Sequence, residues 1–379
     1  MMISAMSRLT IDLAALSYNY RQLRAKCAPG VKFMGVVKAD AYGHGLVPVA
    51  RTLVGDGVDY LGVASLEEGL ALRRAGLKVP VLLLMGLLPQ ESEAAVGADL
   101  EVVLFRRDIA EALEAAGRTQ GKKAKVHIKV DTGMGRLGLL PGEVLPFLEA
   151  LRDCPHLEVV GLVSHLAAAD AEDKTYTLKQ LQEFATLVAS VRQSGWPVPV
   201  SHLANSAALT EIPEAHFGLV RPGIMLYGSP AAPQRPAPVP LKAVMSFTSE
   251  VLQVKEVPPG TCISYGCTYT TERWTKLAVV PVGYCNGYSR LLSNRGAMLI
   301  KGRRVPIRGR VCMNLTMVDV SDLPGVAAGE TVTLLGEDQG SRLTADELAA
   351  WAQTISYEIY CALGTANPRH YIGDHHHGA

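Results

Sequence analysis

The sequence lacks the features that mark several large classes of protein. Its richest apolar run, residues 79–89, is interrupted by Gly86 and is shorter than a membrane-spanning helix, which needs about 20 residues. Its 37 Lys and Arg balance its 36 Asp and Glu, so no basic field attracts nucleic acid or anionic lipid. Its seven cysteines are odd in number and form no C-x-x-C pair, which argues against a disulfide framework and a zinc site. We expect no membrane span, no nucleic-acid partner and no metal site.

The two ends of the chain carry little targeting information. Arg8 and Asp12 interrupt the stretch that would have to be apolar in a secretion signal, so we expect a cytoplasmic protein with reduced cysteines. His375, His376 and His377 could bind a metal ion adventitiously, but we interpret them as a solvated tail. With 379 residues, 48% hydrophobic and 19% charged, the chain is typical of two or three folded domains, or of one large barrel with an appendage.

The first two thirds of the chain alternate short β-branched runs with longer amphipathic stretches, which is the pattern of parallel βα units. The predicted strands are residues 31–37, 60–63, 81–84, 100–104, 125–130, 159–162, 198–203 and 219–220. Apolar residues that recur three and four apart predict helices at residues 66–75, 107–116, 143–152 and 174–194. Eight βα units in about 230 residues predict an α/β fold, a (β/α)8 barrel whose chemistry lies at the carboxyl ends of the strands.

A proline-rich segment, residues 229–240, separates this pattern from a different one. Beyond it, strands follow one another without helices between them, at residues 245–257, 276–282, 297–300, 305–307, 315–320 and 331–335. One helix is predicted after them, opened by the capping box of Thr344 and Glu347 and running to about Ala362. We therefore predict two domains, a barrel over residues 1–235 and a mostly β C-terminal domain over residues 236–379.

The first predicted strand ends at a lysine, in the run Val36-Val37-Lys38-Ala39-Asp40-Ala41-Tyr42-Gly43-His44-Gly45. A lysine at this end of a barrel strand points into the mouth, where desolvation lowers its pKa and favours a Schiff base with an aldehyde. An isolated lysine at a strand end would more often extend its amine to solvent. The aromatic, glycine and imidazole residues that follow favour the first interpretation, because they can form the wall of a pocket for a flat cofactor.

This run resembles the pyridoxal-phosphate lysine motif of bacterial alanine racemases. Other motifs agree with that family in order and spacing: Asp131-Thr-Gly-Met-Gly-Arg136, Ser164-His165-Leu, Ala204-Asn-Ser206, Arg221-Pro-Gly-Ile-Met-Leu-Tyr-Gly, Ile263-Ser-Tyr265-Gly, Val282-Gly-Tyr284, Gly287-Tyr288-Ser289-Arg290, Gly309-Arg-Val-Cys-Met313 and Ser356-Tyr357-Glu358. The resemblance spans nearly the whole chain and both predicted domains, so it is more specific than any single motif.

The resemblance implies two catalytic bases on opposite faces of pyridoxal 5'-phosphate. Lys38 forms the aldimine with the cofactor and is one base, and Tyr265 is the other. Without the motif, a tyrosine in Ser-Tyr-Gly would be interpreted as a core or turn residue. A free tyrosine, with a pKa of about 10, is a poor base at neutral pH. The resemblance places His165 and Arg290 behind it as supporting residues.

The resemblance also implies the cofactor contacts. Arg221 matches the arginine that contacts the pyridine nitrogen; a guanidinium donates a hydrogen bond there instead of a proton, which favours racemisation over transamination. Without the motif, a structural ion pair explains Arg221 equally well. The positions that match the phosphate ligands are Tyr42, Ser206, Gly223, Ile224 and Tyr357.

The remaining implied residues concern the substrate. Arg136 and the backbone of Met313 match the groups that bind the substrate carboxylate. Lys129 matches a lysine that is often carbamylated in the family and then holds Arg136, although an acidic neighbour that neutralises it is an equal alternative. Tyr284 is a supporting position. Asn314 and Asn286 stand where Asp is common, a change that puts strict alanine specificity in question.

Together these residues predict an isomerase, an alanine racemase that supplies D-alanine for peptidoglycan. A broad-specificity or serine-preferring racemase of the same family is the alternative. Two other classes fit less well. Related decarboxylases place an acidic residue at the pyridine nitrogen, where this chain has Arg221, and single-domain barrels that bind the cofactor lack a β domain with a residue like Tyr265. The resemblance further implies a homodimer in which each β domain completes the partner's site.

Overall fold

The structure, a computed structural model, describes residues 6–373, so the predicted histidine tail at 375–377 lies outside the described residues. The chain forms two compact units. The barrel unit comprises residues 16–41 and 46–241, and the β-rich unit comprises residues 42–45, 242 onward and the segment that ends at Ala15. The predicted domain boundary between residues 235 and 236 stays a prediction. The β-rich unit also includes two segments from the start of the chain, the one that ends at Ala15 and residues 42–45.

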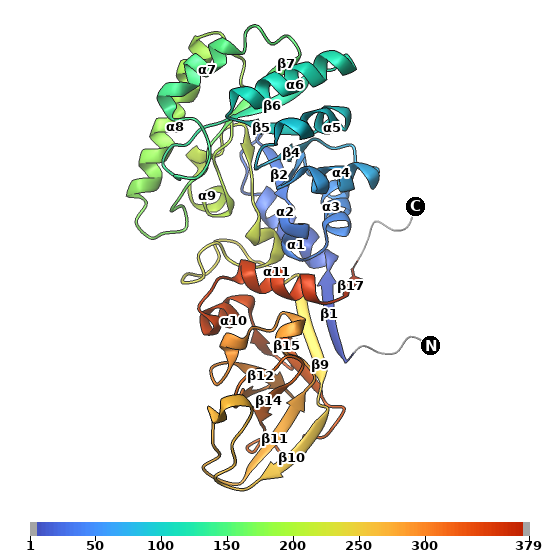
Figure 1. Ribbon diagram of the computed structural model, residues 1–379. Helices are drawn as coiled ribbons and strands as arrows, with labels where there is room; N and C mark the ends of the chain where they lie inside the picture. Colours follow the sequence, from blue (N-terminus) through green and yellow to red (C-terminus); the bar gives the residue numbers. More distant parts are fainter. Residues whose placement is uncertain (1–5, 374–379) are drawn as a thin grey trace. The chain divides into compact units, whose positions relative to one another are not determined.

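The barrel unit is built on a parallel sheet with the order β7-β6-β5-β4-β3-β2-β8. Its strands are β2 (Lys32–Val36), β3 (Tyr60–Val63), β4 (Val81–Leu83), β5 (Glu101–Leu104), β6 (Ala124–Lys129), β7 (Leu157–Val163) and β8 (Leu219–Val220). Side chains from successive strands, including Met34, Leu82, Val103 and Val163, fill the interior. Helices cover the outside of the sheet (Figure 1). The predicted barrel architecture with a following β-rich part is thus confirmed.

One of the eight predicted strands, residues 198–203, is not a regular strand. It forms a single bridge, between Val163 and His202. Pro199 lacks a backbone donor within the segment and Pro197 lacks one just before it, which explains the irregular pairing. The segment still hydrogen-bonds to both neighbours: His202 N donates to Leu162 O at 2.9 Å and Arg221 N donates to Ala204 O at 3.0 Å. The chain therefore closes the barrel between β7 and β8 through an extended segment.

The helices of the barrel unit follow the predicted alternation. They are α1 (Leu13–Arg24, which begins in the other unit), α2 (Lys38–Tyr42, which ends there), α3 (Leu46–Gly55), α4 (Leu66–Arg74), α5 (Ser92–Gly97), α6 (Arg107–Gln120), α7 (Val144–Ala150), α8 (Thr175–Gln193) and α9 (Ser206–Glu211). Predicted helices 66–75, 107–116 and 174–194 correspond to α4, α6 and α8. Predicted helix 143–152 corresponds to α7, preceded by the 3-10 turn Pro141–Glu143. No helix in residues 6–373 has the length and apolarity to cross a membrane.

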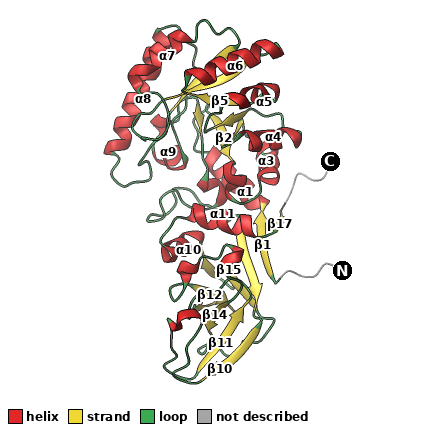
Figure 2. Ribbon diagram, viewed as in Figure 1, coloured by secondary structure: helices red, strands yellow, loops and turns green. Residues whose placement is uncertain are grey.

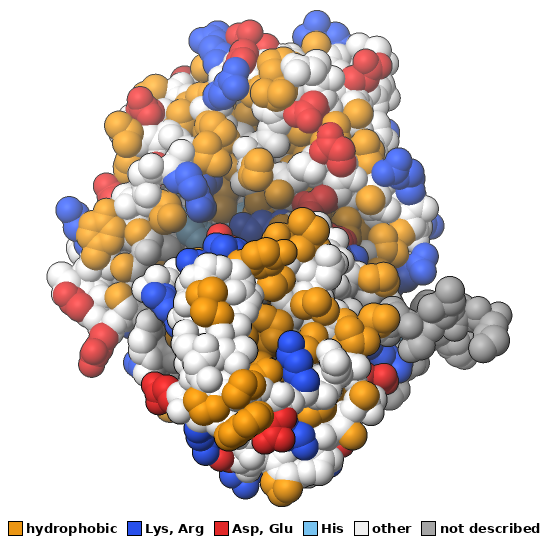
Figure 3. Space-filling model, turned by 60° about the horizontal axis from the view of Figure 1, so that its bottom comes forward, with side chains coloured by type: hydrophobic (Ala, Val, Ile, Leu, Met, Phe, Trp, Pro, Cys, Tyr) orange, Lys and Arg blue, Asp and Glu red, His pale blue; other side chains and the backbone are white. Residues whose placement is uncertain are grey.

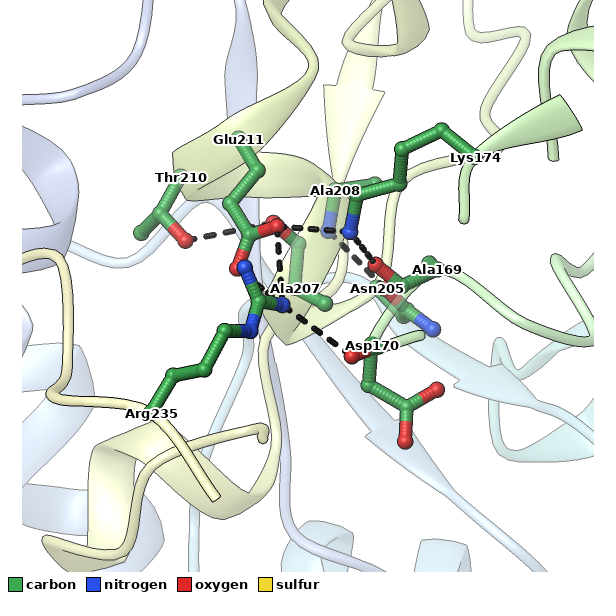
Figure 4. A network of polar contacts seen from close by, with 9 residues as sticks. All are labelled: Ala169, Asp170, Lys174, Asn205, Ala207, Ala208, Thr210, Glu211 and Arg235. Atoms are coloured by element: carbon green, nitrogen blue, oxygen red, sulfur yellow. Dashed lines mark hydrogen bonds and ion pairs between the residues drawn. The ribbon is translucent and has the colours of Figure 1, made fainter. Parts of the chain in front are cut away.

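An ion-pair network ties the proline-rich segment to the barrel unit (Figure 4). Glu211, at the end of α9, receives Lys174 Nζ at 2.6 Å and Arg235 Nη2 at 3.2 Å. Arg235 also donates to the backbone oxygen of Asp170 at 3.0 Å. At the other end of α9, the Asn205 side chain caps the helix by accepting from Ala208 N at 3.1 Å. These contacts hold α9, and with it the turn that contains Ser206.

Strands dominate the β-rich unit, whereas helices and strands alternate in the barrel unit (Figure 2). One sheet has the order β13-β12-β15-β9-β1-β17, with β16 paired to β15, and a second has the order β10-β11-β14. The strands are β1 (Ser7–Asp12), β9 (Met245–Glu250), β10 (Gln253–Val257), β11 (Thr275–Val280), β12 (Ala297–Ile300), β13 (Arg303–Pro306), β14 (Thr316–Asp319), β15 (Thr331–Asp338), β16 (Ser341–Leu343) and β17 (Arg369–Ile372). Because β1 pairs with β9 and β17, the start of the chain belongs to this unit.

The predicted single helix at the end of the chain is two helices, α10 (Ala345–Ala352) and α11 (Ser356–Ala366). The capping box is confirmed: Glu347 N donates to Thr344 Oγ1 and Thr344 N donates to Glu347 Oε2, both at 3.1 Å. Gln353 ends α10 in a left-handed conformation, with φ at 55°. The apolar periodicity continues through this break, which is why the sequence predicted one helix.

Within the β-rich unit, the Tyr42–Gly45 segment packs closely on α11. A Cβ at Gly43 would clash with the backbone oxygen of Tyr360, and one at Gly364 would clash with the backbone oxygen of Gly43. Gly43 also has a φ of 79°, which L residues rarely adopt. The two glycines therefore permit the backbones to meet.

We predict that Gly43→Ala lowers the melting temperature by several degrees more than Gly30→Ala. Gly30 has nearly the same φ, 80°, but open space where its Cβ would lie, so the difference isolates the clash from the backbone strain. Thermal unfolding followed by circular dichroism measures it. Equal losses for the two variants would show that the close approach of Gly43 and α11 does not matter for stability.

Candidate active site

Lys38 follows β2 at its carboxyl end, as predicted, and begins an unusual turn. Ala39, Asp40, Ala41 and Tyr42 all have φ values of 53–54°, in the left-handed region. For residues other than glycine this conformation costs about 1–2 kcal/mol each. The sequence gives no signal for it, because the first glycine comes only after the turn. Strain of this kind persists where surrounding contacts enforce it, and it often accompanies function.

Glu68, on α4, supplies those contacts for the turn after Lys38. Its Oε1 accepts from Asp40 N at 3.0 Å and its Oε2 accepts from Ala64 N at 2.8 Å. The Asp40 carboxylate in turn accepts from Leu46 N at 2.7 Å. One carboxylate thus joins the loops after β2 and β3, and Lys38 is held at the junction between strand and turn.

Arg221 follows β8 and is 94% buried. Its Nη2 donates to the backbone oxygens of Ser164 at 2.7 Å and Leu203 at 3.1 Å, and its Nη1 lies 2.8 Å from His202 Nδ1. Burial lowers its pKa to about 9. The guanidinium is therefore positively charged at neutral pH, and its partners come from two neighbouring segments of the barrel, the end of β7 and the extended segment at 202–203.

His165 lies among several cations of the barrel unit. Its Nδ1 is 3.4 Å from Arg221 Nη2. Burial, followed by the charges of Arg221, Lys129, Arg136 and Lys38, lowers its pKa well below the ordinary value, so the imidazole is neutral. The structure thus brings together five of the predicted site residues. A group of basic side chains next to one neutral ring favours anionic ligands.

The loop after β6 positions Arg136. Asp131 accepts backbone hydrogen bonds from Gly133, Met134, Gly135 and Arg136 at 2.8–3.2 Å. Burial would raise the pKa of Asp131, but these hydrogen bonds lower it below its ordinary value. The carboxylate therefore fixes the tight loop that carries Arg136.

Lys129, the last residue of β6, is almost fully buried. Burial, with the charges of Arg221 and Arg136, lowers its pKa to about 7, against a smaller opposite effect of Asp131. An amine with this pKa is neutral in part at physiological pH. No carboxylate hydrogen-bonds to the Lys129 amine in the described barrel unit.

The predicted phosphate ligands of the barrel unit also lie together. Gly223 N donates to Ser206 Oγ at 2.9 Å. Ile224 follows directly and begins the 3-10 turn Ile224–Tyr227. Ser206 begins α9 and Gly223 follows β8, so hydroxyl and amide donors meet at the carboxyl end of the barrel, where this fold commonly binds phosphate.

Two further predicted phosphate ligands meet in the β-rich unit. The rings of Tyr42 and Tyr357 lie 5.6 Å apart, centroid to centroid, and are tilted by 48°. Burial, followed by Tyr357 and Cys361, raises the pKa of Tyr42 above its ordinary value, so Tyr42 stays protonated and can donate. The motif that begins at Lys38 therefore contributes residues to both units.

Tyr265 is the most exposed large hydrophobic residue among those described, with 71% of its surface accessible. It is preceded by Ser264, whose φ is 64° and whose Oγ donates to Arg310 O at 2.7 Å. The Tyr265 loop is joined to the turn after Arg290, because Asn294 Nδ2 donates to Thr268 Oγ1 at 3.0 Å. Tyr265 is thus presented on a supported loop.

Met313 and Tyr284 lie on adjacent loops of the β-rich unit. Tyr284 N donates to Cys312 O at 3.1 Å and Cys285 N donates to Met313 O at 3.0 Å. The Asn314 amide donates to Cys285 Sγ at 2.8 Å. Asn286 Nδ2 lies 3.3 Å from Asn367 Oδ1, so both asparagines that depart from the family pattern take part in contacts within this unit.

Comparisons with known proteins agree with this geometry. The family model described as alanine racemase, N-terminal domain, matches residues 11–230, and that of the alanine racemase C-terminal domain matches residues 244–371. The chain belongs to the alanine racemase family. Curated alanine racemases of Symbiobacterium thermophilum and Halothermothrix orenii are 45% and 43% identical to it over 364 and 361 residues, which cover 96% and 95% of both proteins.

Solved structures of the family extend the likeness to the fold. The alanine racemase of Streptomyces lavendulae superposes with a TM-score of 0.92 at 36% identity, covering 99% of this chain and all of that one. The enzyme of Bartonella henselae, described with covalently bound pyridoxal phosphate, gives 0.87 at 32% identity, with 97% of this chain covered. The enzyme of Bacillus anthracis, described with bound L-Ala-P, gives 0.90 at 34% identity over 99% of this chain.

Sequence reasoning missed three buried residues next to the family's motifs. Glu101, His127 and His202 lie in the barrel interior and are joined to Arg221. His127 precedes Lys129 by two residues on β6. Because side chains two residues apart in a strand lie on the same face, the sequence could have indicated that His127 points inward if Lys129 does. Nothing in the sequence indicates that β5 places a carboxylate beside it.

The shifted pKa of Lys129 predicts a pH dependence of stability. The folded protein loses this proton near pH 7, whereas the unfolded chain keeps it to about pH 10.4, so the unfolded state binds more protons between these values. The free energy of unfolding should therefore contain a contribution from Lys129 that rises with pH over this window, by up to about 1.4 kcal/mol per pH unit.

Lys129→Met should remove that contribution, and Lys125→Met, an exposed lysine on the same strand, should leave it unchanged. Urea unfolding at pH 7, 8 and 9 in buffers purged of carbon dioxide provides the measurement. If the pH dependence of Lys129→Met matches that of the unaltered protein, the amine does not titrate near pH 7.

Proposed function

We propose that the protein is an isomerase that interconverts L- and D-alanine with pyridoxal 5'-phosphate as its cofactor. The observation that carries the proposal is the group of four basic side chains, Lys38, Lys129, Arg136 and Arg221, that act on the buried, neutral ring of His165. An amine that can bind an aldehyde and an excess of positive charge fit a phosphorylated aldehyde and a carboxylate substrate. The relatives named alanine racemase over the full length support the same assignment.

Two residues hold and move the proton of the substrate Cα in this proposal. The bound cofactor supplies an electron sink that makes this proton removable. Lys38 carries the cofactor and is one base, and Tyr265 is the other, on the opposite face. Racemisation removes a proton from one side and returns one on the other, so two bases are needed for this route. His165 and Arg290 support Tyr265.

The other predicted residues bind and orient. Arg221 donates an N–H to the ring nitrogen of the cofactor. Its pKa of about 9 lies well above neutral pH, so Arg221 keeps its proton in this hydrogen bond. Tyr42, Tyr357, Ser206 and the backbone of Gly223 and Ile224 donate to the phosphate. Gly223 N and Ser206 Oγ lie 2.9 Å apart in a hydrogen bond, which the Gly223 N–H would exchange for one to the phosphate.

The substrate carboxylate binds to Arg136 and to the backbone at Met313, with Tyr284 beside it. Lys129, neutral in part near pH 7, adds carbon dioxide and releases a proton to solvent, and the negative charge of the resulting carbamate holds Arg136. D-alanine formed in this way supplies peptidoglycan synthesis, and we place the enzyme in the cytoplasm, where the precursors are made.

A serine-preferring or broad-specificity racemase is the second candidate, favoured by one observation. Asn314 and Asn286 are neutral where acidic residues are common, and Asn314 donates to the exposed Cys285 instead of accepting a hydrogen bond from it. Because Asn314 and Asn286 carry no charge, they give no electrostatic preference for alanine over an amino acid with a hydroxyl group.

The test is a chiral assay of both substrates with added cofactor. We predict that L- and D-alanine interconvert and approach equal amounts, that kcat/KM is higher for alanine than for serine, and that Lys38→Ala lowers both rates at least a thousandfold. Lys125→Ala serves as a control for a lysine outside the site. A higher kcat/KM for serine would select the second candidate, and no racemisation of either amino acid would reject the function.

We also propose a homodimer with shared active sites. Tyr265, Tyr284, Leu291 and Met313 expose between 43% and 71% of their surface on the β-rich unit. Hydrophobic side chains lie exposed among charged ones on the face that Figure 3 shows. The loops at the carboxyl ends of the barrel strands likewise expose Met85, Leu88 and Leu140. Exposed apolar residues around both sets of site residues fit surfaces that a second copy covers.

Mixed dimers test this arrangement. Lys38→Ala and Tyr265→Ala homodimers should each be nearly inactive. After dissociation and reassociation at equal concentrations, about half of the dimers are mixed, and one of the two sites in each mixed dimer carries neither change. Activity should therefore recover to about a quarter of the unaltered level. No recovery, with mixed dimers confirmed by mass, would place both residues in the same subunit's site.

A further inference from the structure

A line of hydrogen-bonded side chains crosses the interior of the barrel and ends at Arg221. Glu101 Oε2, at the start of β5, lies 2.8 Å from His127 Nε2 on β6. His127 Nδ1 lies 2.9 Å from His202 Nε2, and His202 Nδ1 lies 2.8 Å from Arg221 Nη1. The two imidazole rings meet edge to face, at 82°.

These groups are buried among apolar side chains, which makes their presence costly. Both histidines are fully buried and Glu101 is 4% exposed, within the layer of side chains that includes Met34 and Val103. Polar groups in such a place destabilise a fold unless every one has a partner, and apolar replacements of similar volume are often as stable. A line of three such groups therefore indicates a role beyond stability.

The chemistry of the two ends allows only one arrangement of the protons. A guanidinium has no acceptor, so His202 Nδ1 must accept from Arg221, and the one proton of a neutral His202 must lie on Nε2. That proton is donated to His127 Nδ1, so the proton of His127 lies on Nε2 and is donated to Glu101. A doubly protonated His127 would direct a second proton at His202 Nε2, which already carries one.

The charges that face this line agree with a neutral His202 ring. Burial, followed by the charges of Arg221, His127 and Lys129, lowers the pKa of His202 well below its ordinary value. At the far end, Tyr60 hydrogen-bonds to Glu101. Burial, followed by the effect of Glu101, raises the pKa of Tyr60, so Tyr60 keeps its proton and donates it. Arg73 is the nearby cation that acts on Glu101. Glu101 thus accepts from two neutral donors.

We propose that Glu101, His127 and His202 are positioning residues that fix Arg221 for its contact with the cofactor ring, by holding both histidines in a single tautomer. The inference rests on the proposed function for what Arg221 contacts, but not for the tautomers themselves. A carboxylate at position 101 only accepts, so it sets the direction of every donor in the line. An amide there can donate or accept, so it no longer requires the proton of His127 to lie on Nε2, and Arg221 alone then opposes a reversed line in which an N–H of His202 would face the guanidinium.

The first test reads the tautomers without cofactor or substrate. In protein labelled with 15N-histidine, with His127→Gln and His202→Gln used for assignment, both rings should show a bare Nδ1 and a protonated Nε2. In Glu101→Gln the two nitrogens of His202 should shift toward averaged values. A protonated Nδ1 or a doubly protonated ring in the unaltered protein overturns the proposal, whether or not Glu101→Gln folds.

The second test follows the consequence at Arg221. Glu101→Gln should weaken cofactor affinity, measured by titration of the cofactor absorbance, about fivefold or more. It should lower kcat about tenfold or more, as loss of a supporting residue typically does, and leave KM for alanine nearly unchanged because Arg221 does not contact alanine in our assignment. The control is Glu114→Gln, which alters a buried glutamate that accepts from His156 N and pairs with Arg118.

The outcomes separate the two claims. A fall in kcat without any change in the histidine tautomers, or equal effects of Glu101→Gln and Glu114→Gln, would show a merely structural role and overturn the inference. Altered tautomers with unchanged cofactor affinity would overturn it as well. If the unaltered protein bound the cofactor but racemised nothing, the proposed function would fail, while the tautomer and affinity results would still decide the role of Glu101.

Discussion

The hydrogen bonding of the Arg221 guanidinium, buried in the interior of the barrel, is the interaction on which the rest of the site depends. A buried cation is tolerated only with complete hydrogen bonding. Arg221 has three close hydrogen-bond partners, a backbone oxygen after β7 and a backbone oxygen and the His202 ring of the extended segment. The same two segments close the barrel, so stabilising this one charge also shapes the carboxyl end of the sheet where Lys38, Ser206 and Gly223 lie.

The second constraint is the path of the chain after Lys38. Four consecutive residues without glycine adopt a left-handed turn, held by the Glu68 carboxylate, and the chain then runs into the close approach of Gly43 to α11. Lys38 belongs to the barrel unit and Tyr42 to the β-rich unit. One short motif therefore serves both units, and its strain is the cost of placing an amine and a phenol so few residues apart in different structural surroundings.

Short sequence patterns predicted the features that depend on interactions between residues close together in the chain. The apolar strands, the long amphipathic helices and the capping box at Thr344 were confirmed because periodicity and capping act over a few residues. One expected strand, 198–203, is irregular because of a local signal that the prediction did not weigh, Pro199 within it and Pro197 before it. Features set by distant partners escaped prediction: β1 joins the β-rich unit through pairing with β9. The break at Gln353 and the line from Glu101 to Arg221 likewise depend on tertiary contacts that no motif announces.

The central claim is that Lys38 and Tyr265 act as separate bases on the two faces of one substrate carbon. Deuterium incorporation at Cα, measured by NMR for each alanine enantiomer in D2O with cofactor and the Tyr265→Phe variant, tests it most directly. We predict that exchange continues for the enantiomer whose proton Lys38 removes, while exchange of the other enantiomer and interconversion fall at least a thousandfold. Retained exchange of both enantiomers, with interconversion near the unaltered rate, would contradict the account.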